Sequence, residues 1–158
     1  PKDTGLRLRV VTHHDRSAHP FPIGPFDLQE IWQEVTVRDT QGRVLFHRGG
    51  LDAEDRVDPR ASRLGGVEWQ RDGRHLQQHR VWDVAGLTDV RQIGPDGSVS
   101  DSYQLVLPDD TLGPVHIEVG WNLRRVNPDF AREVYGPDGK RFPVHRLATV
   151  ESDVPWRE

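Results

Sequence analysis

The sequence predicts an all-β protein, an antiparallel Ig-like or fibronectin-III-like β-sandwich of about seven or eight strands with one short helix. In several segments every second residue is apolar, most clearly at Val115, Ile117, Val119, Trp121 and Leu123. Turn signals built on Pro, Asp and Gly separate these segments at intervals of about 8–12 residues. A helical pattern is confined to one short stretch. Alternation with period two is typical of strands that have one buried and one solvated face.

The expected strands follow one another along the chain. In the first, at 6–12, Leu6, Leu8 and Val10 share one face. The other candidates are 31–37, 43–47, 66–70, 79–84, 87–93, 101–107, 114–123 and 143–150. The sequence DTQG at 39–42 is predicted to close a hairpin. The polar stretch 48–65 is predicted to form a long loop between the sheets.

The helix is expected after Asn127, which has the side chain of a cap. Pro128 occupies the first helical position and DFAREVY follows. A chain of 158 residues is long enough for one core. We therefore predict a single domain at 1–150 and a C-terminal tail at 151–158.

Composition excludes several classes of function. The net charge of -4 is spread along the chain, which is unlike the basic surface of a nucleic-acid-binding protein. No apolar run approaches the ~20 residues of a membrane-spanning helix. The absence of cysteine excludes disulfides, thiol catalysis and thiolate metal sites. No G-x-S-x-G, H-E-x-x-H, P-loop or G-x-G-x-x-G motif is present, so we expect a noncatalytic protein.

Several short segments together resemble a known family. They are, in order, AHPFPIG at 18–24, Trp32, GGLD at 49–52, QHRVW at 78–82 and the pair Arg124–Arg125. Their order and spacing resemble those of the β-sandwich (C-terminal-type) domain that follows the haem-binding part of many bacterial multihaem c-type cytochromes. The chain departs from the family pattern at three positions. Ala18 replaces Gly, Ile23 replaces Thr, and Gln78 stands where Arg is common.

The resemblance implies a periplasmic or extracellular scaffold or accessory subunit of an electron-transfer assembly. In that family the haems are held by CxxCH motifs, and this chain has none. The resemblance therefore implies haem c on a partner chain or segment, which this sandwich positions or insulates. The implied partners are a multihaem cytochrome chain or domain and, in a larger assembly, other copies of this chain.

His19 is the first candidate site residue. Pro20 and Pro22 fix their own φ angles and favour extended conformations at His19 and Phe21, so the loop is stiff. Because haem iron accepts a neutral imidazole as an axial ligand, we interpret His19 as a haem contact and a candidate iron ligand. The alternative is that His19 bonds a backbone group and shapes the chain crossover.

His79 is the second candidate haem contact, since it belongs with Trp82 to the family pattern. His75 and His79 are four residues apart, but the strand predicted at 79–84 opposes a shared metal on a helix. Structural packing of His79 is the alternative. His13 or His14 could join His19 in a weak metal site, which would make the chain a small metalloenzyme.

Two further expectations concern the whole domain. An Ig-like binding or adhesion module without a redox role is the alternative function, because this architecture hosts many unrelated functions. Trp32 lies opposite the face formed by Ile31, Val35 and Val37. We therefore expect Trp32 at the sandwich edge or against a neighbouring molecule.

Overall fold

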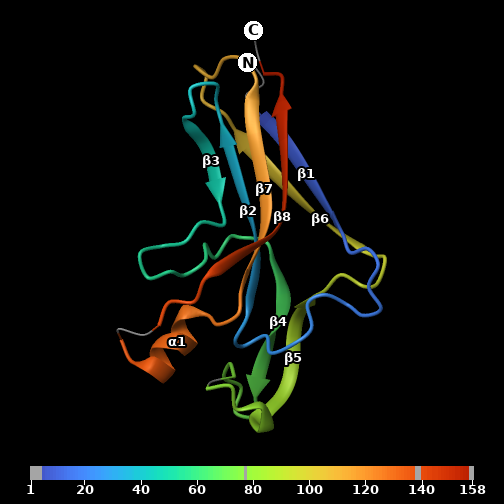
Figure 1. Cartoon of the computed structure of the whole chain (residues 1–158), viewed down its shortest axis with the longest axis vertical. Helices are drawn as coiled ribbons and strands as arrows, with labels where there is room; N and C mark the ends of the chain where they lie inside the picture. Colours follow the sequence, from blue (N-terminus) through green and yellow to red (C-terminus); the bar gives the residue numbers. More distant parts are fainter. Residues whose placement is uncertain (1–4, 77, 138–139, 157–158) are drawn as a thin grey trace.

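The computed structural model describes residues 5–76, 78–137 and 140–156. In this part of the chain it contains eight strands, a short 3-10 turn and one α-helix (Figure 1). The elements are β1 (Gly5–His13), β2 (Glu30–Arg38), β3 (Val44–Arg48), β4 (Arg63–Gln70), η1 (Val81–Asp83), β5 (Val84–Arg91), β6 (Ser98–Val106), β7 (Val115–Arg124), α1 (Pro128–Tyr135) and β8 (Val144–Val154).

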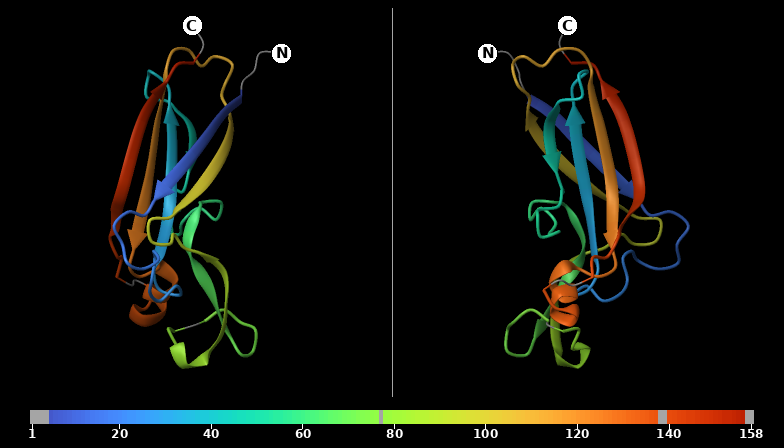
Figure 2. Two further views of the ribbon diagram at one scale, coloured as in Figure 1. Left: turned by 90° about the vertical axis from the view of Figure 1, so that its right-hand side faces the viewer. Right: turned by 60° about the vertical axis from the view of Figure 1, so that its left-hand side comes forward.

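The strands form two antiparallel layers. One layer is the pair β1–β6, and the other is a six-stranded sheet in the order β5-β4-β2-β7-β8, with β3 paired to β2. Figure 2 shows β1 and β6 as a separate layer beside β2 and β7. The predicted all-β sandwich with one short helix is confirmed. The more specific Ig-like or fibronectin-III-like relationship stays a prediction.

The main core lies between the two layers and follows from the alternation in sequence. The inward residues of β7 are buried together with Val35 and Val37 of β2, and they meet apolar residues of β1 and β6. The core residues are Val10, Val35, Val37, Tyr103, Leu105, Leu107, Val115, Ile117 and Val119. A second, smaller core cluster is formed by Ile31, Leu64, Ile93 and Trp121.

Helix α1 begins and ends as the sequence predicts. The Asn127 side chain accepts a hydrogen bond of 2.8 Å from the Phe130 amide, and Pro128 takes the first position. At the other end Gly136 has a φ of 87°, which suits a residue without a side chain. Within the described residues, no helix is both long and apolar enough to cross a membrane.

Strands β4 and β5 form a two-stranded ribbon that extends away from the sandwich (Figure 1). Strand β4 pairs with β2 only at Ile31↔Leu64 and Trp32↔Arg63 before the two strands diverge. The strand predicted at 79–84 is wrong, because η1 occupies Val81–Asp83 and β5 begins only at Val84. Gln78 and His79 have φ angles of 54° and 50°, and two left-handed residues in succession cannot continue a strand.

Strand β8 is an outer edge of the large sheet and is almost entirely exposed. It runs to Val154, so residues 151–154, which were expected in the tail, continue the strand beside the start of β7. The pairing with β7 shifts register between Trp121 and Asn122, which leaves a bulge at Leu147.

Trp32 is buried, and the expectation that it lies at an edge or interface is wrong. It does occupy the face opposite Ile31, but the segment 49–62 folds over that face. Only 1% of Trp32 is exposed, and it packs with Val57 and Ala61. Its indole N–H donates a 2.8 Å hydrogen bond to the Gly49 carbonyl oxygen. The polar stretch 48–65 therefore covers a second face of the sheet, and its last residues begin β4.

Candidate functional site

The loop at 14–29 joins β1 to β2 and carries His19. It is anchored at Phe21, whose N–H and C=O exchange hydrogen bonds of 2.8 and 2.7 Å with Ile93. Pro22 follows through a cis peptide bond and is fully buried. The predicted stiffness of this loop thus has two sources, the prolines themselves and a backbone pairing to a residue far along the chain.

The His19 imidazole is exposed, and one of its two nitrogens is fixed. Nδ1 lies 2.9 Å from the Pro20 carbonyl oxygen. Because a carbonyl oxygen can only accept, Nδ1 carries a proton, and in the neutral imidazole Nε2 carries the lone pair. Among the described residues, no hydrogen bond or ion pair engages Nε2. The Ser17 hydroxyl donates to the His19 carbonyl oxygen at 3.0 Å and holds the backbone locally.

The structure separates the histidines at the end of β1. His14 turns toward the body, where Nδ1 lies 3.2 Å from the Ile93 carbonyl oxygen and the ring lies near Phe21. His13 is exposed at the end of the strand. Across the described ranges, no group of three or more His, Asp and Glu side chains is arranged to hold a metal ion.

His79 is held by a carboxylate from the same loop that carries His19. Its Nδ1 lies 3.1 and 3.2 Å from the two carboxylate oxygens of Asp27, so Nδ1 donates, and in the neutral ring Nε2 carries the lone pair. The Asp27 side chain is only 6% exposed. His75 does not join His79. It pairs with Trp69 through an isolated bridge and an edge-on ring contact of 4.4 Å.

Glu68 on β4 adds a second acid near this pair. Burial raises the pKa of Glu68, and the charge of Asp27 raises it further. One carboxylate oxygen of Glu68 is buried without a hydrogen-bond partner within the described part.

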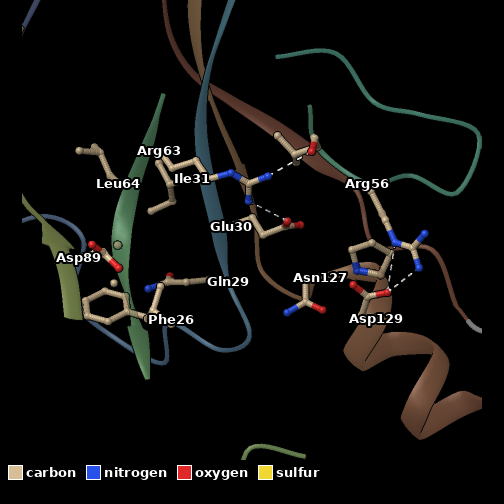
Figure 3. A pocket seen from close by; sticks show the side chains of 15 residues that line it. Phe26, Gln29, Glu30, Ile31, Arg56, Arg63, Leu64, Asp89, Asn127 and Asp129 are labelled. Carbon is tan, nitrogen blue, oxygen red and sulfur yellow. Dashed lines mark hydrogen bonds and ion pairs between the residues drawn. The ribbon is translucent and has the colours of Figure 1, made fainter. Parts of the chain in front are cut away.

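A groove opens where β4 diverges from β2 (Figure 3). It has a volume of about 490 Å³, and its lining includes residues of β2, β4 and the start of α1. Four of its charged side chains form two ion pairs with each other, and the fifth, Asp89, accepts a hydrogen bond from the Thr88 hydroxyl. Arg63 lies 3.4 Å from Glu30, and Arg56 lies 3.1 Å from Asp129. The groove therefore offers few free polar groups to a ligand.

Behind the groove Glu30 also binds the nearly buried Arg124. Arg124 Nε lies 3.0 Å from Glu30 Oε2, and its guanidinium lies 5.7 Å from the centre of the Trp32 ring. This arrangement stabilises the end of β7 against β2. In the sequence Arg124 stands out only as part of the pair Arg124–Arg125, and its partner Glu30 is 94 positions away.

Together these elements define the class of protein. The chain is a two-layer antiparallel β-sandwich with a projecting ribbon, and two of its histidines are each held through Nδ1. No family model and no curated protein matches it. Its fold is similar to that of a penta-heme cytochrome c552 from Thermochromatium tepidum, with a TM-score of 0.66 and 16% sequence identity.

That similarity covers 98% of this chain but 37% of the cytochrome chain, so this chain spans well under half the length of that protein. At 16% identity the likeness shows the fold alone. The predicted multihaem-cytochrome resemblance is thus supported at the level of the fold. Because the sequence has no cysteine, haem c cannot be attached to this chain through thioether bonds.

Proposed function

We propose that this chain is a noncatalytic scaffold in a multihaem c-type cytochrome assembly of the periplasm or the cell exterior. The supporting observation is the likeness of nearly the whole chain to part of a penta-heme cytochrome. In this proposal the haems are attached to a partner chain or segment. The sandwich positions them and excludes water, which changes the potential of a haem.

His19 is the proposed direct contact with a partner haem. A metal-bound histidine commonly donates its other ring N–H to a carbonyl or a carboxylate. His19 already has this arrangement through Pro20, at 2.9 Å. Its Nε2 could therefore bind iron without a change of tautomer. His79 has the same arrangement through Asp27, which supports its role as a second candidate contact.

The test is to purify the polypeptide or complex that carries this chain from the cells that make it, and to measure c-type haem by absorbance. The proposal predicts stoichiometric haem that stays with the chain through purification. Absence of haem, combined with binding to a glycan or a surface protein, would favour the adhesion alternative and overturn the proposal.

The role of His19 has its own variant and control. His19→Ala is expected to convert one low-spin haem to a high-spin form, as seen by electron paramagnetic resonance. His116→Ala is the matched control, because His116 is also partly exposed but pairs with Asp153 at 2.9 Å on β7 and β8. An unchanged spectrum in His19→Ala would remove axial ligation from the proposal and leave the scaffold role standing.

A further inference from the structure

The far end of the ribbon exposes a tryptophan. We call residues 71–76 and 78–84 the ribbon tip. It lies at the end of the molecule opposite both termini (Figure 1). Within it Trp82 is 70% exposed and Val81 is 54% exposed, whereas Trp32 and Trp121 are buried. Exposed aromatic and aliphatic side chains at one point commonly mark a protein contact.

The same tip carries three arginines, of which Arg80 is close in sequence to Trp82. Arg74 pairs with Asp72 at 2.6 Å, and Arg80 pairs with Asp83 at 2.8 Å. Arg71 has no ion pair within the described residues, so these five side chains leave one positive charge uncompensated. A hollow of about 220 Å³ lies among them and Gln70.

Hydrogen bonds hold the turn that carries Trp82. The Asp83 amide donates to the Arg80 carbonyl oxygen at 2.8 Å, which closes the turn that carries Trp82. Asp27 binds His79 and thereby ties the start of this turn to the loop at 14–29. Trp82 is therefore presented on a turn that is fixed to the body of the protein. In this arrangement His79 acts as a positioning residue.

From these features we infer that the ribbon tip docks on the exposed edge of a haem carried by the partner. Trp82 and Val81 cover the apolar edge of the macrocycle, Arg71 binds a propionate, and Arg80 binds the second propionate while its guanidinium also pairs with Asp83. The inference rests on the proposed function, because it takes the partner to be a haem protein.

A haem edge is proposed as the docking partner because its charge and shape complement those of the tip. The tip requires a partner surface that is flat and apolar at its centre and carries carboxylates at its rim. A haem edge with two propionates has both features. Arginine is suited to the second, since its planar guanidinium binds a carboxylate through two hydrogen bonds. Tryptophan and arginine are also the residues that most often dominate the energy of a protein contact.

The test uses the full chain and a defined probe, the haem c undecapeptide prepared from a mitochondrial cytochrome c. Cyanide blocks the open iron position, so histidine ligation does not contribute. The low-spin ferric haem broadens nearby NMR signals, and binding should selectively broaden the Trp82 indole and the amides of 80–83. Trp82→Ala and the double variant Arg71→Gln/Arg80→Gln should each weaken binding about fivefold or more.

Two controls and one further variant test whether binding depends on the ribbon tip. Arg9→Gln changes an exposed arginine on β1, outside the tip, and should leave binding unchanged. A probe with esterified propionates should bind the wild type more weakly than the unmodified probe does. The arginine double variant should bind the two probes with equal affinity. His79→Ala leaves Trp82 and the arginines in place, but the turn loses its contact with the loop at 14–29. In this variant the probe should broaden the signals of Trp82 and of residues 80–83 less selectively than in the wild type.

Several results would overturn the inference. They are no binding by the wild type, equal binding by all variants, broadening centred elsewhere, or preference for vesicles of anionic lipid over the probe. None of these results depends on whether haem copurifies with the chain, and copurification does not depend on the tip. Failure of the docking surface and failure of the scaffold proposal are therefore separable.

Discussion

The pair formed by Glu30 and Arg124 gives the sharpest test of the packing. The Arg124 side chain is 3% exposed and that of Glu30 is 15% exposed. Glu30→Ala leaves a guanidinium in the interior without its carboxylate, which typically costs about 3–5 kcal/mol of unfolding free energy. That is a large part of the total stability of a domain, about 5–15 kcal/mol. Arg124→Met should cost less, because the remaining Glu30 is nearer to water and keeps Arg63.

The assay is guanidinium chloride unfolding followed by tryptophan fluorescence, with a double-mutant cycle over Glu30→Ala and Arg124→Met. We expect a coupling energy of about 2 kcal/mol or more. Arg63→Met is the matched control. Arg63 also contacts Glu30, but its side chain is 42% exposed, and such pairs contribute about 0–1 kcal/mol. The buried-charge reasoning would be refuted if Glu30→Ala lost less than about 1 kcal/mol of unfolding free energy and if the effects of Glu30→Ala and Arg124→Met on that free energy were additive.

Three further outcomes are expected. Hydrogen bonds from the Arg60 guanidinium, opposed by burial, lower the pKa of Asp58 from 3.8 to about 2. The stability that this carboxylate contributes should be lost as pH falls from about 4 to about 2, and urea unfolding of Asp58→Asn should lack this loss. Burial, with the nearby Asp101, raises the pKa of Tyr103 from 10.0 to about 12. Stability should therefore fall as pH rises through this interval, and thermal unfolding of Tyr103→Phe should show a smaller alkaline decrease. Gly49→Ala would place a Cβ against the Gln33 carbonyl oxygen at a φ of 86°. Gly49→Ala should lower the free energy of unfolding by more than about 2 kcal/mol, as measured by chemical denaturation. Gly42 has a φ of 79° but open space around it, so Gly42→Ala should lower that free energy by about 1 kcal/mol. Equal losses in the two variants would contradict the steric argument.

Much of the fold could be predicted because burial on one face imposes period two on the sequence. Strand β7 is the clearest case, since its alternating residues are the inner face of the sandwich. The turn at Val81–Asp83 was missed because HRVWDV contains the valines and tryptophan that are common in strands. The left-handed φ angles that break it belong to Gln78 and His79, and a positive φ is uncommon in any residue other than glycine.

The candidate site was less accessible from sequence. The stiffness of the His19 loop follows from two prolines, but the hydrogen bond that assigns the proton to Nδ1 depends on the folded loop. The contact of His79 with Asp27 joins residues 52 positions apart. Trp32 was placed on the correct face, yet its cover comes from a polar stretch whose few apolar residues, Val57 and Ala61, are easily overlooked.

The bulged outer strand β8 has a consequence for handling the isolated polypeptide. A long, straight, uncharged border strand recruits further chains through its free amides and carbonyls. Here the kink at Leu147 interrupts that template, and Arg146, Glu151 and Asp153 place charge along it. Concentrated solutions of the chain should therefore resist fibril growth along this border, and a variant that straightens and neutralises it should not.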